Sequence, residues 1–264
     1  MTSHPQDLVR LETHEEVLRA SGDSAFVRYD LPAAMDSPGW ALGRAVAVTR
    51  RTHTRRLGLL VMGPPEDASA LVGSLAAAGL LPDGLRGVTV TRGSLDAVAV
   101  HLPPGQLSEW EWMCTSTPPK PVATEEALST LTEADLPAIT GLLEAANPGT
   151  DARPFRHPGQ SWVGVREGGR LLACGVEEPG VSGHPVLSGI TVHPDARGRG
   201  LGLAVTAHLT REAVRRTGVC TLGMYSHNDT ARRVYLGLGY GDVHEWSSRR
   251  LSVAATAAPA PSRG

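Results

Sequence analysis

The chain has few lysines, aromatic residues and cysteines, and none of its apolar runs is long enough to cross a bilayer. Its single lysine, Lys120, stands between two prolines. This position excludes a Walker phosphate loop, which needs Gly-Lys followed by Ser or Thr. Its three cysteines, Cys114, Cys174 and Cys220, form neither a metal-binding spacing nor an evident disulfide framework. We therefore predict no metal site and a reducing, cytoplasmic environment.

The balance of charge excludes other classes of partner. A formal net charge of −2 gives no bulk attraction to nucleic acid. A short basic run at residues 50–56 is interpreted as a solvated hairpin loop rather than an anion contact. The first seven residues contain neither a positive region nor an apolar one, so nothing in them predicts secretion. We expect a soluble globular protein whose partners are neither nucleic acid nor membrane.

A glycine-rich stretch in the second half predicts a phosphate site. Residues 187–192 form an apolar, β-branched run typical of a strand, and residues 203–214 repeat apolar side chains at helical spacing. Residues 197–202 lie between them and contain three glycines, which let the backbone approach an anion at the start of the helix. A dinucleotide fingerprint fits poorly, because its third glycine would fall on Leu203.

A second motif covers residues 228–240. Asn228 is a good N-cap and Gly237 a good helix stop, which predicts about two turns of helix. Asn228, Ala231 and Tyr235 stand at i, i+3 and i+7 and therefore share one helix face. The small side chain of Ala231 would let a ligand lie close to that face.

The two motifs together resemble the signatures of the GNAT superfamily of acyl-CoA-dependent N-acyltransferases. Residues 197–202 match Arg-x-x-Gly-x-Gly, and residues 228–240 match Asn-x-x-Ala-x-x-x-Tyr-x-x-x-Gly followed by an aromatic residue. The resemblance implies an α/β fold with a mixed sheet, the GNAT fold, in the second half. It also implies an acyl-CoA cleft between two splayed parallel strands, at residues 187–192 and 219–225.

The same resemblance implies roles for individual residues. The backbone of Ile190 and Val192 would pair with the pantetheine amides of acetyl-CoA, and Asn228 and Ala231 would lie along its pantetheine arm. Tyr235 would protonate the departing thiolate, which suits a phenol with an ordinary pKa of about 10. The pyrophosphate would bind the backbone N–H groups of Arg197, Gly198, Arg199, Gly200, Leu201 and Gly202.

The general base stays open at this point. The position ten residues before Arg197, where some relatives carry a glutamate, holds Leu187. A water molecule or an amine that arrives neutral would also suffice. Other candidates nearby in sequence or on the linker side are Ser188, His184, Glu177, Glu178, His193, Glu109 and Glu111.

The first half has a similar outline but no phosphate motif. Its patterns predict helices at residues 6–20 and 64–79. They predict strands at residues 25–31, 40–49, 57–62, 87–92 and 96–102. It is interpreted as an accessory α/β domain that could be a degenerate GNAT copy. The predicted division is residues 1–116, a proline-rich linker at 117–123, the GNAT domain at 124–253, and a disordered tail at 254–264.

Two tryptophans precede the linker. Trp110 and Trp112 alternate, so in a strand they face the same side. They would either pack the two halves together or form the wall of an acceptor pocket between them.

The predicted activity is transfer of an acetyl group from acetyl-CoA to a primary amine, by direct attack of the amine, with Tyr235 as the acid. Two alternatives remain: an amino-acid N-acyltransferase that uses a longer acyl-CoA, and a non-catalytic module that binds or senses acyl-CoA. The acceptor and the oligomeric state cannot be read from the sequence, because acceptor specificity usually depends on variable loops.

Overall fold

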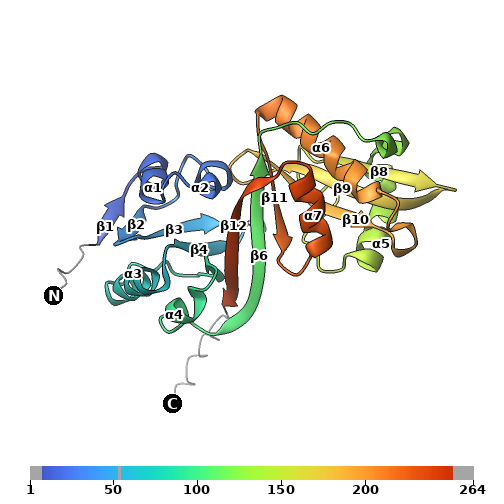
Figure 1. Ribbon diagram of the computed structural model, residues 1–264. Coiled ribbons are helices and arrows are strands. Elements are labelled where there is room, and N and C mark those ends of the chain that lie inside the picture. Colours follow the sequence, from blue (N-terminus) through green and yellow to red (C-terminus); the bar gives the residue numbers. More distant parts are fainter. Residues whose placement is uncertain (1–7, 53–54, 252–264) are drawn as a thin grey trace, which may run out of the picture.

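One mixed β-sheet runs through the whole computed structural model, which describes residues 8–52 and 55–251 (Figure 1). The strands are β1 (Val9–Leu11), β2 (Gly39–Leu42), β3 (Ala45–Arg51), β4 (Leu57–Met62), β5 (Gly87–Thr91), β6 (Gly105–Thr115), β7 (Leu128–Leu131), β8 (Ser161–Glu167), β9 (Arg170–Pro179), β10 (Pro185–Val192), β11 (Cys220–Tyr225) and β12 (Gly241–Leu251). The helices are α1 (His14–Ala20), α2 (Ala25–Asp30), α3 (Pro65–Ala77), α4 (Leu95–Ala99), α5 (Leu136–Ala146), α6 (Leu201–Thr217) and α7 (Asp229–Gly237), with 3₁₀ turns η1 (Ala123–Ala127), η2 (Glu133–Asp135) and η3 (Pro194–Ala196). The predicted α/β class with a mixed sheet is confirmed.

The two halves repeat one order of elements. In each half, the first four strands pair in antiparallel order. A long helix then connects the fourth strand to a fifth, which pairs with it in parallel. The first parallel pair is β4–β5 with α3 between its strands, and the second is β10–β11 with α6 between them. A shorter helix and a long last strand follow in both halves, namely α4 with β6 and α7 with β12.

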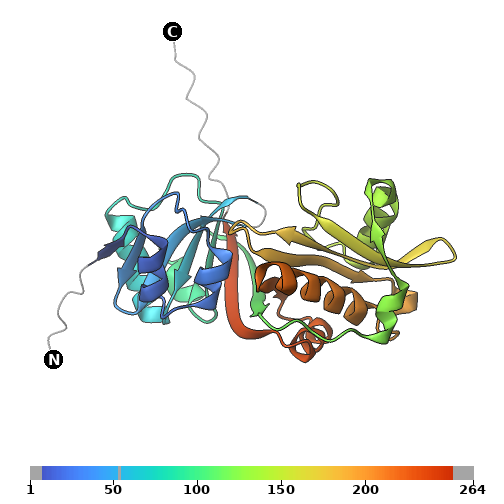
Figure 2. The same cartoon turned by 90° about the horizontal axis from the view of Figure 1, so that it is seen from above.

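The last strands of the two halves are interleaved. In the sheet, β12 lies between β5 and β6, and β6 lies between β12 and β11. All of these contacts are antiparallel, and Trp246 of β12 stands opposite Trp110 of β6. The strand beside each half's parallel pair therefore comes from the other half, and both strands lie at the junction of the halves (Figure 2). The sheet is continuous across the proline-rich segment at residues 117–123.

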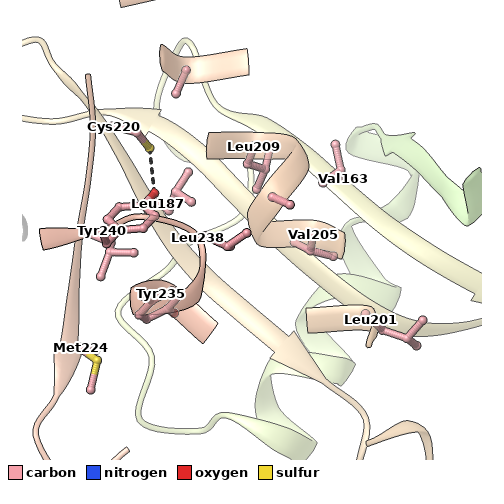
Figure 3. Packing of buried hydrophobic residues seen from close by; sticks show 14 of the residues in the cluster. Val163, Leu187, Leu201, Val205, Leu209, Cys220, Met224, Tyr235, Leu238 and Tyr240 are labelled. Carbon is pink, nitrogen blue, oxygen red and sulfur yellow. Dashed lines mark hydrogen bonds between the residues drawn. The ribbon is translucent and has the colours of Figure 1, made fainter. Parts of the chain in front are cut away.

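Local sequence explains the elements that surround the site. Strand β10 has helices on both faces: Leu187, Ile190 and Val192 face the core beneath α6, whereas Gly189 and Thr191 face the side that α5 covers. Helix α6 is flanked by Gly200 and Gly218, both in the left-handed conformation at φ of 75° and 82°. Its apolar side packs onto the sheet with side chains of β10 and β11 (Figure 3).

Three expectations for the first half are wrong, and a fourth, the single strand at residues 40–49, is divided into the hairpin of β2 and β3. Residues 25–31 and 96–102 were expected as strands, yet they contain the short helices α2 and α4. Ser24 caps α2 by accepting from the amide of Val27, and burial of Phe26 and Val27 outweighs their β propensity. The helix expected at residues 6–20 is shorter, because residues 9–11 pair with β2 as strand β1. The predicted tail at 254–264 lies outside the described residues.

The two halves also share a hydrophobic core. Phe26 of α2 lies between Trp112 of β6 and Trp246 of β12, with ring centroids 5.3 and 4.7 Å away. Trp112 is buried there, whereas Trp110 is partly buried and donates from its indole nitrogen to the Ser248 hydroxyl over 2.8 Å. The two tryptophans face the same side of the sheet as predicted, and the packing interpretation is confirmed for Trp112.

Candidate functional site

The site begins where β10 and β11 separate. The two strands pair at Val186 with Thr221 and at Leu187 with Leu222. Beyond Leu187, no described strand pairs with the edge of β10 that faces β11. The pairing of β10 with β9 shifts register between Ser188 and Thr191, which marks a bulge.

Glycine is required at that bulge. Gly189 has a φ of +61°, and a Cβ atom added there would lie 2.9 Å from the Cβ of Ala152. The bulge includes Ile190, and Val192 ends the strand. Both side chains are half-buried against the core beneath α6. The amide of His193 donates to Leu172 of β9, so the backbone groups of Val192 and Ile190, which alternate with it along the strand, point to the opening.

The glycine-rich loop leads directly into the uncapped end of α6. Gly198 and Gly200 have φ values of 77° and 75°, and residues 197–200 are exposed. No side chain caps α6, so the N–H groups of Leu201, Gly202 and Leu203 have no intrahelical acceptor, and the first intrahelical bond runs from Ala204 to Gly200. Arg199 pairs with Glu167 over 2.9 Å at the surface. A long helix that begins in this way favours an anion at its N-terminus.

Helix α7 presents the second motif. Asn228 is the N-cap, as predicted, and its side-chain oxygen accepts from the amide of Ala231 over 3.1 Å. The side-chain amide nitrogen of Asn228 remains available as a donor, because the residue is exposed. Ala231 is half-buried against the core, and the helix ends at Gly237, where the sequence predicts a stop.

Two neighbouring tyrosines, Tyr235 of α7 and Tyr240 just before β12, differ in their hydroxyl groups (Figure 3). Tyr240 is hydrogen-bonded to the Thr210 hydroxyl over 2.8 Å and donates to the Cys220 sulfur over 3.2 Å. Tyr235 as a residue is 8% exposed, and no described residue forms a hydrogen bond with its hydroxyl. Burial raises the pKa of Tyr235 to about 12, so the phenol keeps its proton throughout the neutral range.

The structure separates the base candidates. Leu187 is buried beneath α6. Glu177 lies on the same face and pairs with Arg216 over 2.6 Å, whereas Glu178 accepts a hydrogen bond from Ser188 over 2.7 Å. The others lie elsewhere: His193 in the loop after β10 beside Arg170, His184 against the ring of Tyr29, Glu109 exposed on β6, and Glu111 buried on β6.

A buried charge cluster that the sequence did not predict joins both halves. Glu111 is fully buried and pairs with Arg232 of α7 and, over 3.6 Å, with Arg92 from the end of β5. Arg92 also pairs with Glu245 over 2.8 Å and donates to the Ser226 hydroxyl. Arg232 lies 121 positions from Glu111 in the sequence, so no local pattern could have revealed this contact.

Replacing Arg232 with methionine should lower the free energy of unfolding by about 3 kcal/mol, because it removes one partner of a buried charge. Denaturation by urea measures this loss. Arg233→Met is the matched control, since Arg233 is exposed and its guanidinium contacts only the Thr230 hydroxyl in the described structure. A surface change of that kind should stay within about 0.5 kcal/mol. Equal losses in both variants would contradict a stabilising role for the cluster.

The three cysteines are free and buried. Burial raises the pKa of each thiol from 9.0 to about 12. Among the described residues, no group of His, Cys, Asp or Glu is placed to hold a metal ion, and no helix is long and apolar enough to span a membrane.

Alkaline solution should therefore destabilise the protein. The thiols ionise in the unfolded chain at lower pH than in the folded one, so the free energy of unfolding should fall as the pH rises from 9.0 to about 12. Urea denaturation at about pH 8 and about pH 10 tests this dependence. Cys174→Ala should make the fall shallower, and an unchanged slope would contradict the assignment.

Sequence comparison identifies the second half. The family model described as the acetyltransferase (GNAT) family matches residues 111–240, which include the last five residues of β6, the glycine-rich loop and α7. These residues form a GNAT acetyltransferase domain. No curated protein matches the chain.

Solved structures resemble both halves. A GNAT-family putative acetyltransferase from Novosphingobium aromaticivorans is 24% identical, with a TM-score of 0.53 over 74% of this chain and 86% of that one. A Drosophila protein is 16% identical, with a TM-score of 0.54 over 92% and 98% of the two chains. A GCN5-related N-acetyltransferase from Kribbella flavida is 16% identical, with a TM-score of 0.51 over 94% and 98%. At these identities the likeness shows the fold, and the last two extend it to the first half.

Proposed function

We propose that the protein transfers an acetyl group from acetyl-CoA to a primary amine in the cytoplasm. The observation that carries this proposal is the uncapped N-terminus of α6, reached through Gly198 and Gly200, beside the opening between β10 and β11. Such a helix end suits the pyrophosphate of acetyl-CoA. The opening suits its thioester, and the three free thiols fit a reducing compartment.

The residues at the site fit the acyl donor. The backbone N–H groups of residues 197–202 would hold the pyrophosphate, with charge from Arg197 and Arg199. The backbone of Ile190 and Val192 would pair with the pantetheine amides. The free amide nitrogen of Asn228 would bond the pantetheine arm, and Ala231 leaves room for that arm beside α7.

The chemistry would be direct attack of the amine on the thioester carbonyl. The new carbon–nitrogen bond forms first and the nitrogen gives up a proton; the carbon–sulfur bond then breaks, and the sulfur leaves with negative charge. The Tyr235 hydroxyl, protonated and without a described hydrogen-bond partner, can supply a proton to that sulfur. This arrangement supports catalysis over simple sensing of acyl-CoA.

We propose that the first half is a degenerate copy of the second, with the division at residues 1–116, 117–123 and 124–253. The repeated order of elements supports this interpretation. In the first half, the helix that corresponds to α6 is α3, which begins at Pro65. Only Gly63 and Pro64 separate it from β4. That connection has no glycine-rich loop for an anion. The first half would then supply strand β6 and helix α2 to the active half.

Release of free thiol from acetyl-CoA in the presence of a panel of amines tests the proposed function, and calorimetry with acetyl-CoA measures binding separately. We expect KM values for acetyl-CoA and for the amine between about 1 μM and about 1 mM, the usual range for enzymes. Longer acyl-CoA esters in the same assay test the amino-acid N-acyltransferase alternative. Binding without turnover for every amine would instead favour the sensing module.

A further inference from the structure

Glu178 lies next to the point where β10 and β11 separate. It stands on β9 directly opposite Val186, whose other neighbour is Thr221 of β11. Ser188 follows Leu187, the last residue of β10 that pairs with β11. The Ser188 hydroxyl donates to Oε1 of Glu178 over 2.7 Å. The hydroxyl and the carboxylate are therefore linked at the edge of the opening.

Glu178 and Tyr235 lie on opposite faces of the sheet. Leu187 and Leu222 point into the core beneath α6 that also buries Tyr235. Side chains alternate along a strand, so Val186 and Ser188 point to the other face, where the carboxylate of Glu178 also lies. The strands separate at this level, so a thioester placed between them can be reached from both faces. An amine can attack from the Ser188 face while the sulfur leaves toward Tyr235.

The Ser188 face is open above β11. Gly223 is exposed, and the atoms nearest to a Cβ atom added there would be those of the Trp110 ring at 3.6 Å and the Glu111 backbone at 3.9 Å, both at ordinary contact distance. Helix α5 packs on β9 and β10, and α2 of the first half packs on β6, and between them the Gly223–Tyr225 end of β11 stays exposed on this face, whereas Thr221 is buried. Tyr225, at the end of β11, is 45% exposed. An acceptor amine can therefore approach over β11, between α5 and α2.

The carboxylate of Glu178 is oriented but not neutralised. The side-chain amide of Gln160 donates to Oε2 of Glu178 over 2.6 Å, and the Trp162 indole donates to Gln160 over 3.3 Å. In the described part of the chain, no arginine, lysine or histidine pairs with Glu178. Glu177 and Glu111 differ, since arginines hold both. Glu178 is thus the carboxylate at the opening that is free to accept a proton.

We infer that Glu178 is the general base of the proposed acetyl transfer and that the Ser188 hydroxyl relays the proton. As the amine nitrogen bonds to the carbonyl carbon, Ser188 takes a proton from that nitrogen and passes its own proton to Oε1 of Glu178. The carbon–sulfur bond then breaks, and Tyr235 protonates the sulfur. The products are the amide and free CoA thiol, and solvent returns the proton from Glu178 to Tyr235. This inference rests on the proposed function.

The test compares Glu178→Gln with Glu177→Gln in the full-length protein. Glu177 is the matched control, because it precedes Glu178 on β9 and, opposite Leu187 of β10, points to the other face. With the best acceptor found for the wild type, Glu178→Gln should lower kcat/KM at neutral pH by about 100-fold, the usual contribution of a general base. Glu177→Gln should stay within about threefold, below that contribution. Both variants should bind acetyl-CoA with wild-type affinity by calorimetry.

The pH dependence separates a base from a structural residue. Hydroxide ion can take the proton from the attacking nitrogen when the carboxylate is absent, and its concentration increases with pH, so the defect of Glu178→Gln should shrink to less than about tenfold near pH 9.5. Ser188→Ala should lose nearly as much as Glu178→Gln at neutral pH. A pH-independent defect, or Glu178→Gln activity within about threefold of wild type, overturns the base assignment. Wild-type activity in Ser188→Ala overturns the relay.

Failure of the proposed function would look different. A wild-type protein that binds acetyl-CoA but releases no thiol with any amine would remove acetyl transfer itself, and with it any base. A wild-type protein that does not bind acetyl-CoA would remove the donor site at α6. Neither result can be confused with an active wild type whose Glu178→Gln variant is equally active.

Discussion

Replacing Tyr235 with phenylalanine should lower kcat by about 100-fold and leave the KM for acetyl-CoA nearly unchanged. The phenyl ring preserves the packing against Tyr240, and the change removes only a hydroxyl that no described residue hydrogen-bonds. The hydroxyl acts when the sulfur leaves, so its loss affects the transition state rather than the binding of substrate. We expect a loss of rate at the lower end of the usual range for a general acid, because the thiolate of a thiol with a pKa of about 8.5 leaves readily.

Tyr240→Phe is the matched control for this experiment. The Tyr240 hydroxyl is hydrogen-bonded to Thr210 and Cys220 in the core, so its removal should cost about 1 kcal/mol of stability and leave kcat unchanged. Steady-state kinetics and urea denaturation of the two variants give opposite patterns if the assignments hold. Turnover of Tyr235→Phe within about threefold of wild type would make Tyr235 a packing residue.

Replacing Gly200 with valine should weaken the binding of acetyl-CoA by about 100-fold or more. A side chain at this position would occupy the space where the pyrophosphate meets the first turn of α6. Loss of two charge-assisted hydrogen bonds at about 1.5 kcal/mol each corresponds to that factor. A Cβ atom at Gly200 would meet only Thr124, at 3.6 Å, so the protein itself leaves room for the new side chain.

Gly218→Val controls for the backbone strain. Gly200 and Gly218 flank the same helix, both have a left-handed conformation, and valine should cost each about 1–2 kcal/mol of stability. Gly218 lies at the end of α6 remote from the glycine-rich loop. Calorimetry should therefore show lost affinity for Gly200→Val and normal affinity for Gly218→Val. Equal affinities in both variants would remove the phosphate assignment.

The sequence allowed a good prediction where structure depends on neighbours along the chain. The passage from strand to glycine loop to helix at residues 187–217 is local, because turn glycines and helical spacing determine it. The N-cap at Asn228 follows equally local rules. The family resemblance was therefore visible from two short motifs.

Features that depend on distant residues could not be predicted. Helix α2 contains Phe26, Val27 and Tyr29, which favour strands, and it is helical because its apolar side packs on tryptophans from both halves. The proximity of Glu178 to the opening depends on the register of β9 with β10. The pairing of Glu111 with Arg232 and the interleaving of β6 with β12 likewise join segments more than a hundred positions apart.

The interleaving of β6 and β12 determines when the sheet can close during synthesis on the ribosome. Strand β6 leaves the ribosome early, but its two neighbours are β11 and β12, near the far end of the chain. Until they are made, both edges of β6 and one edge of β5 stay open, a state that favours aggregation and chaperone binding. The half that is translated first therefore completes its sheet last.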